Sequence, residues 1–177
     1  MNRRLACAAL VALFAIPHAH AALEPGARAP AFSTAAALAG QEMRFDLGQA
    51  LTQGPVVLYF YPAAFTAGCT IEAHEFAEAT EQYAQLGARV VGVSADNITV
   101  LKQFSQSACQ GRFAVAADAD GRIMRAYDAV HDRNPDVAQR ISYVISPDGR
   151  IIDAYTDSNP HRHVERTLRA LREWLRQ

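Results

Sequence analysis

Two apolar runs near the middle of the chain indicate its fold class. Residues 56–61 and 89–94 are almost continuously apolar, and β-branched and aromatic side chains make up most of them, as is typical of strands buried on both faces. Each run is followed by a segment with helical spacing, expected at 67–86 and from 98 to about 109. This alternation predicts a right-handed parallel crossover and therefore an α/β fold.

The second half of the chain predicts an antiparallel edge for the same sheet. A third short strand is expected at 113–117, followed by a short helix through Tyr127 and an exposed loop at 131–139. Residues 140–145 and 150–155 indicate two further strands, and the Ser-Pro-Asp-Gly sequence between them is typical of a hairpin turn.

The two ends of the expected domain have weaker patterns. Short strands are expected at 31–33 and 43–45, with a turn at Gly40 between them and a short helix at 47–51. The last helix is expected to start at Asn159. It should bury one apolar stripe, formed by Val164, Leu168, Leu171 and Leu175.

Composition indicates one domain behind a cleavable leader. The chain has 177 residues, of which 50% are hydrophobic and 20% charged, and this suits a single domain with a substantial core. Residues 1–21 have a basic start, an apolar stretch from Leu5 to Ile16 and an Ala-X-Ala end, the pattern of a secretory signal peptide cleaved after Ala21. The apolar stretch is too short for a permanent membrane anchor. We therefore expect a periplasmic protein whose domain covers 22–177.

The net charge and the cysteine content limit which binding partners and which cysteine chemistry are expected. Loss of Arg3 and Arg4 with the leader takes the net charge from −1 to −3, which points neither to nucleic acid nor to an anionic membrane surface. The same cleavage removes Cys7 and leaves Cys69 and Cys109. Two thiols in an oxidising compartment can form a structural disulfide, but the position of Cys69 favours a reactive role.

Cys69 is expected in the first turn of a helix that starts where a buried strand ends. The strand pattern stops at Pro62, and Thr66 is a good N-cap for the helix that follows. Unpaired backbone N–H groups and the positive end of the helix dipole favour a thiolate there. Spacing puts Cys69 on one face with Ala73 and Phe76, which indicates a partly shielded pocket. The alternative for an isolated cysteine is a buried structural thiol.

The order Pro62, three residues, Thr66, two residues, Cys69 resembles the active-site signature of the peroxiredoxins. The stretch from Thr70 to Ala73 resembles the bacterioferritin-comigratory (PrxQ-type) branch of this alkyl hydroperoxide reductase/thiol-specific antioxidant family. The resemblance implies a thioredoxin-like fold, in which helices flank a central mixed sheet with an added N-terminal hairpin. It also implies that Pro62 shields the sulfur, that the Thr66 hydroxyl bonds the peroxide, and that Cys69 is the peroxidatic nucleophile.

The resemblance further implies a cation near the sulfur. Arg140 opens one of the later strands, where the family has an arginine that reaches the peroxidatic cysteine; otherwise Arg140 would be an ordinary exposed arginine. A guanidinium stays charged at every relevant pH, and its planar donors can hold both thiolate and peroxide oxygens. Glu72, one helical turn after Cys69, either orients Arg140 or simply interacts with the helix dipole.

A second thiol is needed once Cys69 has become a sulfenic acid. The PrxQ-type branch often has a cysteine five residues after the first, but here that position is His74. Some members instead place their resolving cysteine in the next helix, which implies this role for Cys109 near the end of that helix. The alternative is that Cys109 is a passive buried thiol.

These observations predict a thiol peroxidase that reduces hydrogen peroxide and organic hydroperoxides and is recycled by a thioredoxin-like or small-thiol reductant. Two alternatives stay open, a one-cysteine peroxidase resolved by an external thiol and a redox sensor or binding protein that does not turn over. A thiol–disulfide oxidoreductase is disfavoured because the sequence has no Cys-X-X-Cys. We expect no cofactor and no metal, since His161 and His163 do not share a helix face and no cluster has metal-ligand spacing. A monomer or weak homodimer is expected.

Overall fold

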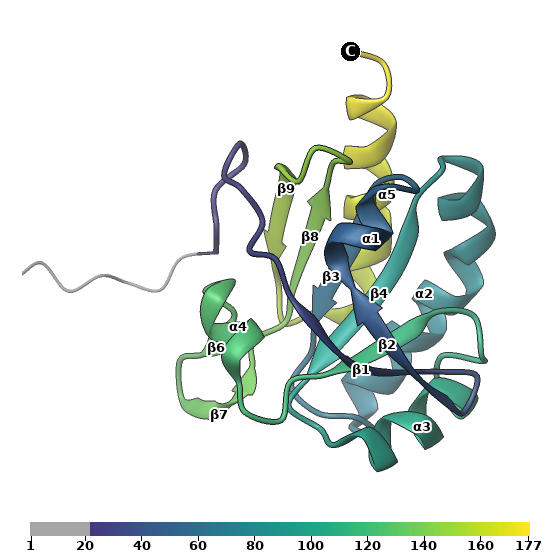
Figure 1. Cartoon of the computed structure of the whole chain (residues 1–177), viewed down its shortest axis with the longest axis vertical. Coiled ribbons are helices and arrows are strands. Elements are labelled where there is room, and N and C mark those ends of the chain that lie inside the picture. Colours follow the sequence, from purple (N-terminus) through teal and green to yellow (C-terminus); the bar gives the residue numbers. More distant parts are fainter. Residues whose placement is uncertain (1–21) are drawn as a thin grey trace, which may run out of the picture.

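A seven-stranded mixed sheet forms the middle layer of the structure, with helices on both faces (Figure 1). The computed structural model describes residues 22–177, so the predicted leader at 1–21 lies outside the described residues. In spatial order the strands are β2 (Gln41–Asp46), β1 (Ser33–Leu38), β5 (Ala114–Ala117), β4 (Arg89–Ser94), β3 (Val56–Phe60), β8 (Ile141–Ile145) and β9 (Ile151–Thr156). The predicted α/β fold with a mixed sheet and an N-terminal hairpin, β1–β2, is confirmed.

The centre of the sheet is parallel and buried, and its edges are antiparallel. β3 pairs in parallel with β4, and β4 with β5. Every residue of β3 is buried because its side chains point alternately into the cores on the two faces of the sheet. On one side of this centre β8 and β9 pair antiparallel, and on the other side the β1–β2 hairpin does the same.

The α-helices of residues 22–177 divide between the two faces of the sheet. One face is covered by α2 (Ala67–Gln85), α3 (Ile98–Ser107) and α5 (His163–Trp174), and the other by α1 (Leu47–Leu51) and α4 (Arg122–Ala126). Beneath α2, the rings of Tyr59 and Phe76 stack with their centroids 4.4 Å apart. Among residues 22–177, no helix combines the length and the apolar character that crossing a bilayer would take.

The stretch expected to be an exposed loop at 131–139 is a two-stranded ribbon. β6 (Val130–His131) and β7 (Asn134–Ala138) pair antiparallel beside α4 (Figure 1). Pro135 is compatible with this strand because a two-stranded ribbon has open edges, where a missing N–H donor breaks no ladder. The first strand also differs from the one expected at 31–33. It runs from Ser33 to Leu38 and pairs with β2 on one side and β5 on the other.

The last helix buries most of the predicted stripe, since Val164 also packs against the core, but its buried face extends further to one side. A short 3₁₀ turn, η1 (Pro160–Arg162), precedes α5, and Asn159 Oδ1 caps this turn by accepting from the backbone of His161. Leu168 and Leu171 are buried as expected, but Leu175 is 50% exposed. The buried face also includes two polar residues, His163 and Thr167. The reason is that neighbouring elements offer them polar partners, Ser142 of β8 for His163 and Tyr83 of α2 for Thr167.

Gly92 allows an aromatic ring to lie flat against β4. A Cβ atom at this position would come within 2.9 Å of the Tyr59 ring and hydroxyl, which is closer than real side chains approach. Tyr59 lies directly across from Gly92 in the parallel pairing of β3 with β4. The missing side chain therefore lets the Tyr59 ring fill the space under α2.

Candidate active site at the start of helix α2

Cys69 lies in the first turn of α2, close to the carboxyl end of β3, as the pattern predicted. The loop at 61–66 turns the chain between them, and Phe65 in this loop has a φ of 63°, which is unusual for a bulky residue. The Phe65 ring packs edge-on against Phe104 of α3, with ring centroids 5.2 Å apart, and this contact supports the strained turn. The Cys69 side chain is buried, with 1% of its surface exposed.

Thr66 is the N-cap residue of α2, but its side chain bonds elsewhere. Thr66 occupies the N-cap position as predicted, but its hydroxyl donates to the backbone carbonyl of Ala63 at 3.0 Å and does not bond a backbone N–H of the helix. The side chain is exposed, and after donating its hydrogen the oxygen retains lone pairs that can accept one. This orientation suits a group that accepts the hydrogen of an incoming peroxide.

Asp96 holds the active-site loop in place, a role that sequence analysis missed. Asn97 caps α3 by accepting from the backbone N–H of Val100 at 3.1 Å, which leaves the carboxylate of the preceding residue free for another role. The Asp96 carboxylate instead accepts from the backbone N–H of Ala64 at 2.7 Å and from the Ser94 hydroxyl at 2.8 Å. It thereby ties the loop before Cys69 to the end of β4.

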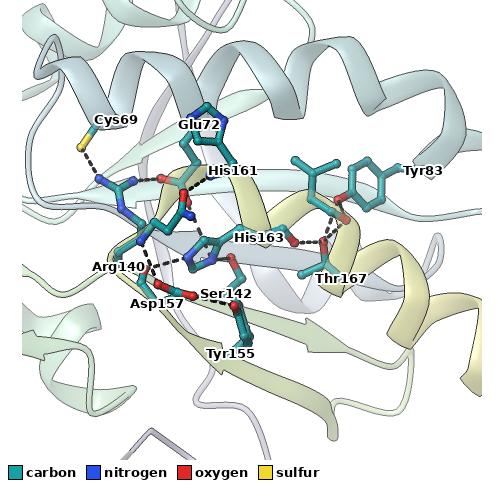
Figure 2. A network of polar contacts seen from close by, with 12 residues as sticks. Cys69, Glu72, Tyr83, Arg140, Ser142, Tyr155, Asp157, His161, His163 and Thr167 are labelled. Carbon is teal, nitrogen blue, oxygen red and sulfur yellow. Dashed lines mark hydrogen bonds and ion pairs between the residues drawn. The ribbon is translucent and has the colours of Figure 1, made fainter.

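Arg140 brings a positive charge to the sulfur. It lies directly before β8, and because Ile141 of β8 pairs with Phe60 of β3, Arg140 is level with the start of α2. Arg140 Nη2 donates to Cys69 Sγ at 3.4 Å, and only 9% of the arginine is exposed (Figure 2). A Cβ atom at Gly68 would lie 3.1 Å from Nη2, so the glycine leaves room for this approach.

Glu72 is fully buried one turn further along α2 and forms an ion pair with Arg140. Its Oε2 accepts from Arg140 Nη1, so the guanidinium lies between the carboxyl group and Cys69 (Figure 2). Burial raises the pKa of Glu72 to about 8, although the charge of Arg140 and its hydrogen bond oppose part of that rise. The contact fits the first of the two uses considered for Glu72, the orientation of Arg140.

Sequence analysis also missed a buried histidine behind this ion pair. His163, in the first turn of α5, has Nδ1 2.8 Å from the Ser142 hydroxyl and Nε2 2.9 Å from the backbone carbonyl of Asp157. Burial lowers the pKa of His163 below its usual value. The signal in the sequence was weak: His163 and Thr167 are one turn apart beside the apolar stripe, a spacing that also occurs on solvated faces.

Cys109 lies just beyond the end of α3 and is fully buried. The helix ends at Ser107, and the two residues after Cys109, Gln110 and Gly111, have φ of 52° and 67°. Burial raises the pKa of the Cys109 thiol, which makes it a poor nucleophile in this state. Within the described chain, Cys69 and Cys109 are both unbridged. The imidazole of His74, from α2, hydrogen-bonds the Gln110 amide at 3.1 Å.

Pro62 and Arg140 line the same cavity. Pro62 is half-buried, and the cavity, of about 190 Å³, is also lined by Gln139 and Thr156. This cavity adjoins the guanidinium that contacts Cys69, so the structure brings together Pro62, Arg140, Glu72 and Cys69 at one end of the sheet.

Comparison with known proteins identifies the family. The model of the AhpC/TSA family matches residues 25–154, and these include the whole region around Cys69 and Arg140. The chain belongs to this family, the peroxiredoxins. It is therefore a thiol peroxidase.

Several relatives carry names from the branch that the sequence resembled. Peroxiredoxin Bcp from Xanthomonas campestris is 30% identical over 128 residues, which cover 69% of this chain and 79% of that protein. The chloroplastic peroxiredoxin Q of Sedum lineare is 31% identical over 118 residues, or 66% of this chain and 63% of that protein. The matched part thus spans less than two thirds of this plant relative.

Solved structures agree with the fold. Peroxidoxin BcpB from Mycobacterium tuberculosis superimposes with a TM-score of 0.78 at 26% identity, covering 85% of this chain and 97% of that one. Peroxiredoxin Q from Xanthomonas campestris gives a TM-score of 0.69 at 26% identity over 78% of this chain and 89% of that one.

Replacement of Gly68 by alanine should disturb the contact between Arg140 and Cys69 without destabilising the first turn of α2. We expect Gly68→Ala to push the Arg140 guanidinium away from Cys69 and to slow oxidation by hydrogen peroxide severalfold in stopped-flow measurements. The free energy of unfolding should not fall, because alanine favours a helix over glycine by about 1 kcal/mol. Gly48→Ala, in the exposed part of α1, is the matched control and should leave the rate unchanged. An unaltered rate in Gly68→Ala would show that the close approach is not needed.

Proposed function

We propose that this peroxiredoxin reduces hydrogen peroxide and organic hydroperoxides with Cys69 as its nucleophile. The observation that carries the proposal is the hydrogen bond from Arg140 to the Cys69 sulfur at the start of α2. A guanidinium and a helix N-terminus both stabilise negative charge, which is present first on the thiolate and then on the leaving oxygen.

The peroxide step follows from these positions. The Cys69 thiolate attacks one oxygen of the peroxide, the O–O bond breaks, and a sulfenic acid forms on Cys69. The other oxygen leaves with the bonding electrons and takes a proton to give water or an alcohol. Arg140 and the first N–H groups of α2 lie where they can stabilise that oxygen. The Thr66 hydroxyl accepts the hydrogen of the bound peroxide, and Pro62 limits the access of water.

Substitution of the two central residues tests this step. Cys69→Ser should abolish peroxide consumption, because a hydroxyl is a far weaker nucleophile near neutral pH. Arg140→Lys should keep the fold but slow the peroxide step at least tenfold (~1.4 kcal/mol), since an ammonium group cannot contact Cys69 and Glu72 with parallel donors. Arg122→Lys, at an exposed ion pair with Asp120, serves as the control for the arginine-to-lysine change. A peroxide step in Arg140→Lys as fast as in this control would remove Arg140 from the mechanism.

We propose further that Cys109 resolves the sulfenic acid as an intramolecular disulfide, which a thioredoxin-like protein or a small thiol then reduces. A disulfide needs Cα atoms within about 7 Å, and its two sulfurs must meet. Cys69 and Cys109 both lie in the core between the sheet and helices α2 and α3. We infer that the first turn of α2 and the turn after α3 open locally to bring them together, because ends of helices open at less cost than the whole domain.

Mass spectrometry under non-reducing conditions distinguishes the three possible outcomes of peroxide treatment. Loss of two hydrogens within one chain is the expected result, and Cys109→Ser should instead retain an added oxygen on Cys69. A stable added oxygen in the unsubstituted protein would favour a one-cysteine peroxidase, and no change would favour a sensor without turnover. Faster amide exchange at 67–73 and around Cys109 in the oxidised protein should accompany the disulfide.

We also propose that the protein is exported and that residues 1–21 are removed. The support is the basic start, apolar stretch and Ala-X-Ala end of this segment. Expressed in a bacterium with a periplasm, the exported protein should begin at Ala22, as measured by intact mass. Ala21→Arg should block cleavage, since the site takes small residues. Exported protein that retains residues before Ala22 would contradict the proposed cleavage site.

A further inference from the structure

One oxygen of Glu72 lacks a hydrogen bond in the network behind Cys69. Oε2 pairs with Arg140, but Oε1 is buried and finds no hydrogen-bond partner among residues 22–177. His163 Nδ1 lies 3.8 Å from this oxygen, and both side chains are fully buried. The distance exceeds that of a hydrogen bond, so the two groups must move closer before they can share a proton. An unpaired carboxyl oxygen thus faces an imidazole in a site closed to solvent.

The contacts of His163 define which ring nitrogen carries hydrogen in the neutral ring. The Asp157 carbonyl can only accept, so Nε2 donates to it at 2.9 Å. Nδ1 therefore accepts from the Ser142 hydroxyl at 2.8 Å. The nitrogen on the Glu72 side of the ring is then the unprotonated one (Figure 2). Its single lone pair can take a proton or a hydrogen bond from the carboxyl group only when the Ser142 hydroxyl turns its own hydrogen away.

We propose that His163 is a positioning residue for the peroxide step and that Glu72 and His163 together hold one proton behind Arg140. The proton is either on Glu72 Oε1, directed at Nδ1, or on Nδ1, which then faces both Oε1 and the Ser142 oxygen as acceptors. In both forms the Glu72–His163 pair has no net charge. The inference rests on the proposed function of Cys69 and Arg140. It assigns to the Glu72–His163 pair the control of how strongly the Arg140 guanidinium stabilises a thiolate on Cys69.

The state of this proton changes the charge near Cys69. While the proton is present, the pair is neutral and Arg140 is the only charged partner of the thiolate within this group of four side chains. Once it is lost, the Glu72 carboxylate competes with the thiolate for the same guanidinium, and the buried group gains a net negative charge. The peroxide step should therefore slow at alkaline pH. The raised pKa of Glu72, about 8, and the lowered pKa of His163 place this change near neutral or mildly alkaline pH.

Other charged groups face His163 from each element packed against it. Burial and the charge of Arg140 disfavour protonation of the ring, whereas Asp157 and Glu75 favour it. The Tyr155 ring of β9 packs edge-on against the imidazole, with ring centroids 5.1 Å apart. Because these influences oppose one another inside one network, the titration belongs to the Glu72–His163 pair and not to either residue alone.

The test is the pH dependence of the rate at which hydrogen peroxide oxidises Cys69, measured by stopped flow on the mature chain. His163→Gln retains an N–H donor for Asp157 but cannot bind the proton. In this variant, the decrease in the oxidation rate at alkaline pH should occur about one pH unit lower than in the unsubstituted protein. That is the shift in pKa that loss of one hydrogen bond to a carboxyl group produces. His161→Gln, two residues earlier in an exposed position, is the matched control and should follow the unsubstituted profile.

A second substitution separates positioning from a general structural effect. Glu72→Gln has a permanently neutral side chain in place of the protonated carboxyl group, so its alkaline fall should disappear, and adding His163→Gln should cause no further shift. If His163→Gln only scales the rate equally at every pH, or if the two changes shift the profile independently, the shared proton is excluded.

A measurement on the unsubstituted protein covers the case in which His163→Gln does not fold. The nitrogen NMR signals of His163 should show Nε2–H at neutral pH, and the Nδ1 signal should shift over the pH range in which the rate falls. An Nδ1 signal that stays constant through that range would overturn the proposal. This readout needs no turnover, so it is distinguishable from failure of the proposed function, which would show as peroxide consumption in Cys69→Ser.

Discussion

The guanidinium of Arg140 lies between two ionisable groups, Cys69 on one side and Glu72 on the other, in a place almost closed to water. A buried charge is costly unless it is paired, so the charge of Arg140 favours an anion on one of these two neighbours. The arrangement around Cys69 therefore depends on this one cation. Where its charge is directed decides whether the sulfur or the carboxyl group is stabilised as an anion.

The fold supplies this contact through the register of two strands and the absence of one side chain. Antiparallel pairing of Ile141 with Phe60 brings the residue before β8 level with the start of α2. Gly68 leaves the space that the guanidinium occupies. Neither feature belongs to the cysteine segment alone, because the cation comes from a strand that is added to the sheet about 70 residues later in the chain. The reactive thiol is thus a product of the assembled sheet.

Local sequence patterns predicted much of the fold, but they could not predict which side chains from distant segments come into contact in the folded domain. The apolar run of β3 and the helix after it were found because strand and helix periodicities are properties of short segments. Arg140 was singled out only through the family resemblance. The roles of His163 and Asp96 were missed because each bonds a backbone group far away in the sequence or outside its own element, a carbonyl at 157 and an amide at 64, which no side-chain pattern reveals. The ribbon of β6 and β7 was missed because its polar, Pro-containing sequence is equally typical of a loop.

The burial of Cys109 has a consequence for the resistance of Cys69 to irreversible oxidation when the peroxide concentration is high. If Cys109 resolves Cys69 as proposed, each sulfenic acid must wait until the turn after α3 opens, and during that wait a second peroxide molecule competes for the same sulfur. The product of that competition is a sulfinic acid, which ordinary thiols do not reduce. On that proposal, the peroxide concentration at which Cys69 is irreversibly oxidised would depend on the packing of Leu101 and Phe104, two buried residues of α3. Both the resistance of the protein to irreversible oxidation and its turnover rate would then depend on core residues that do not contact the substrate.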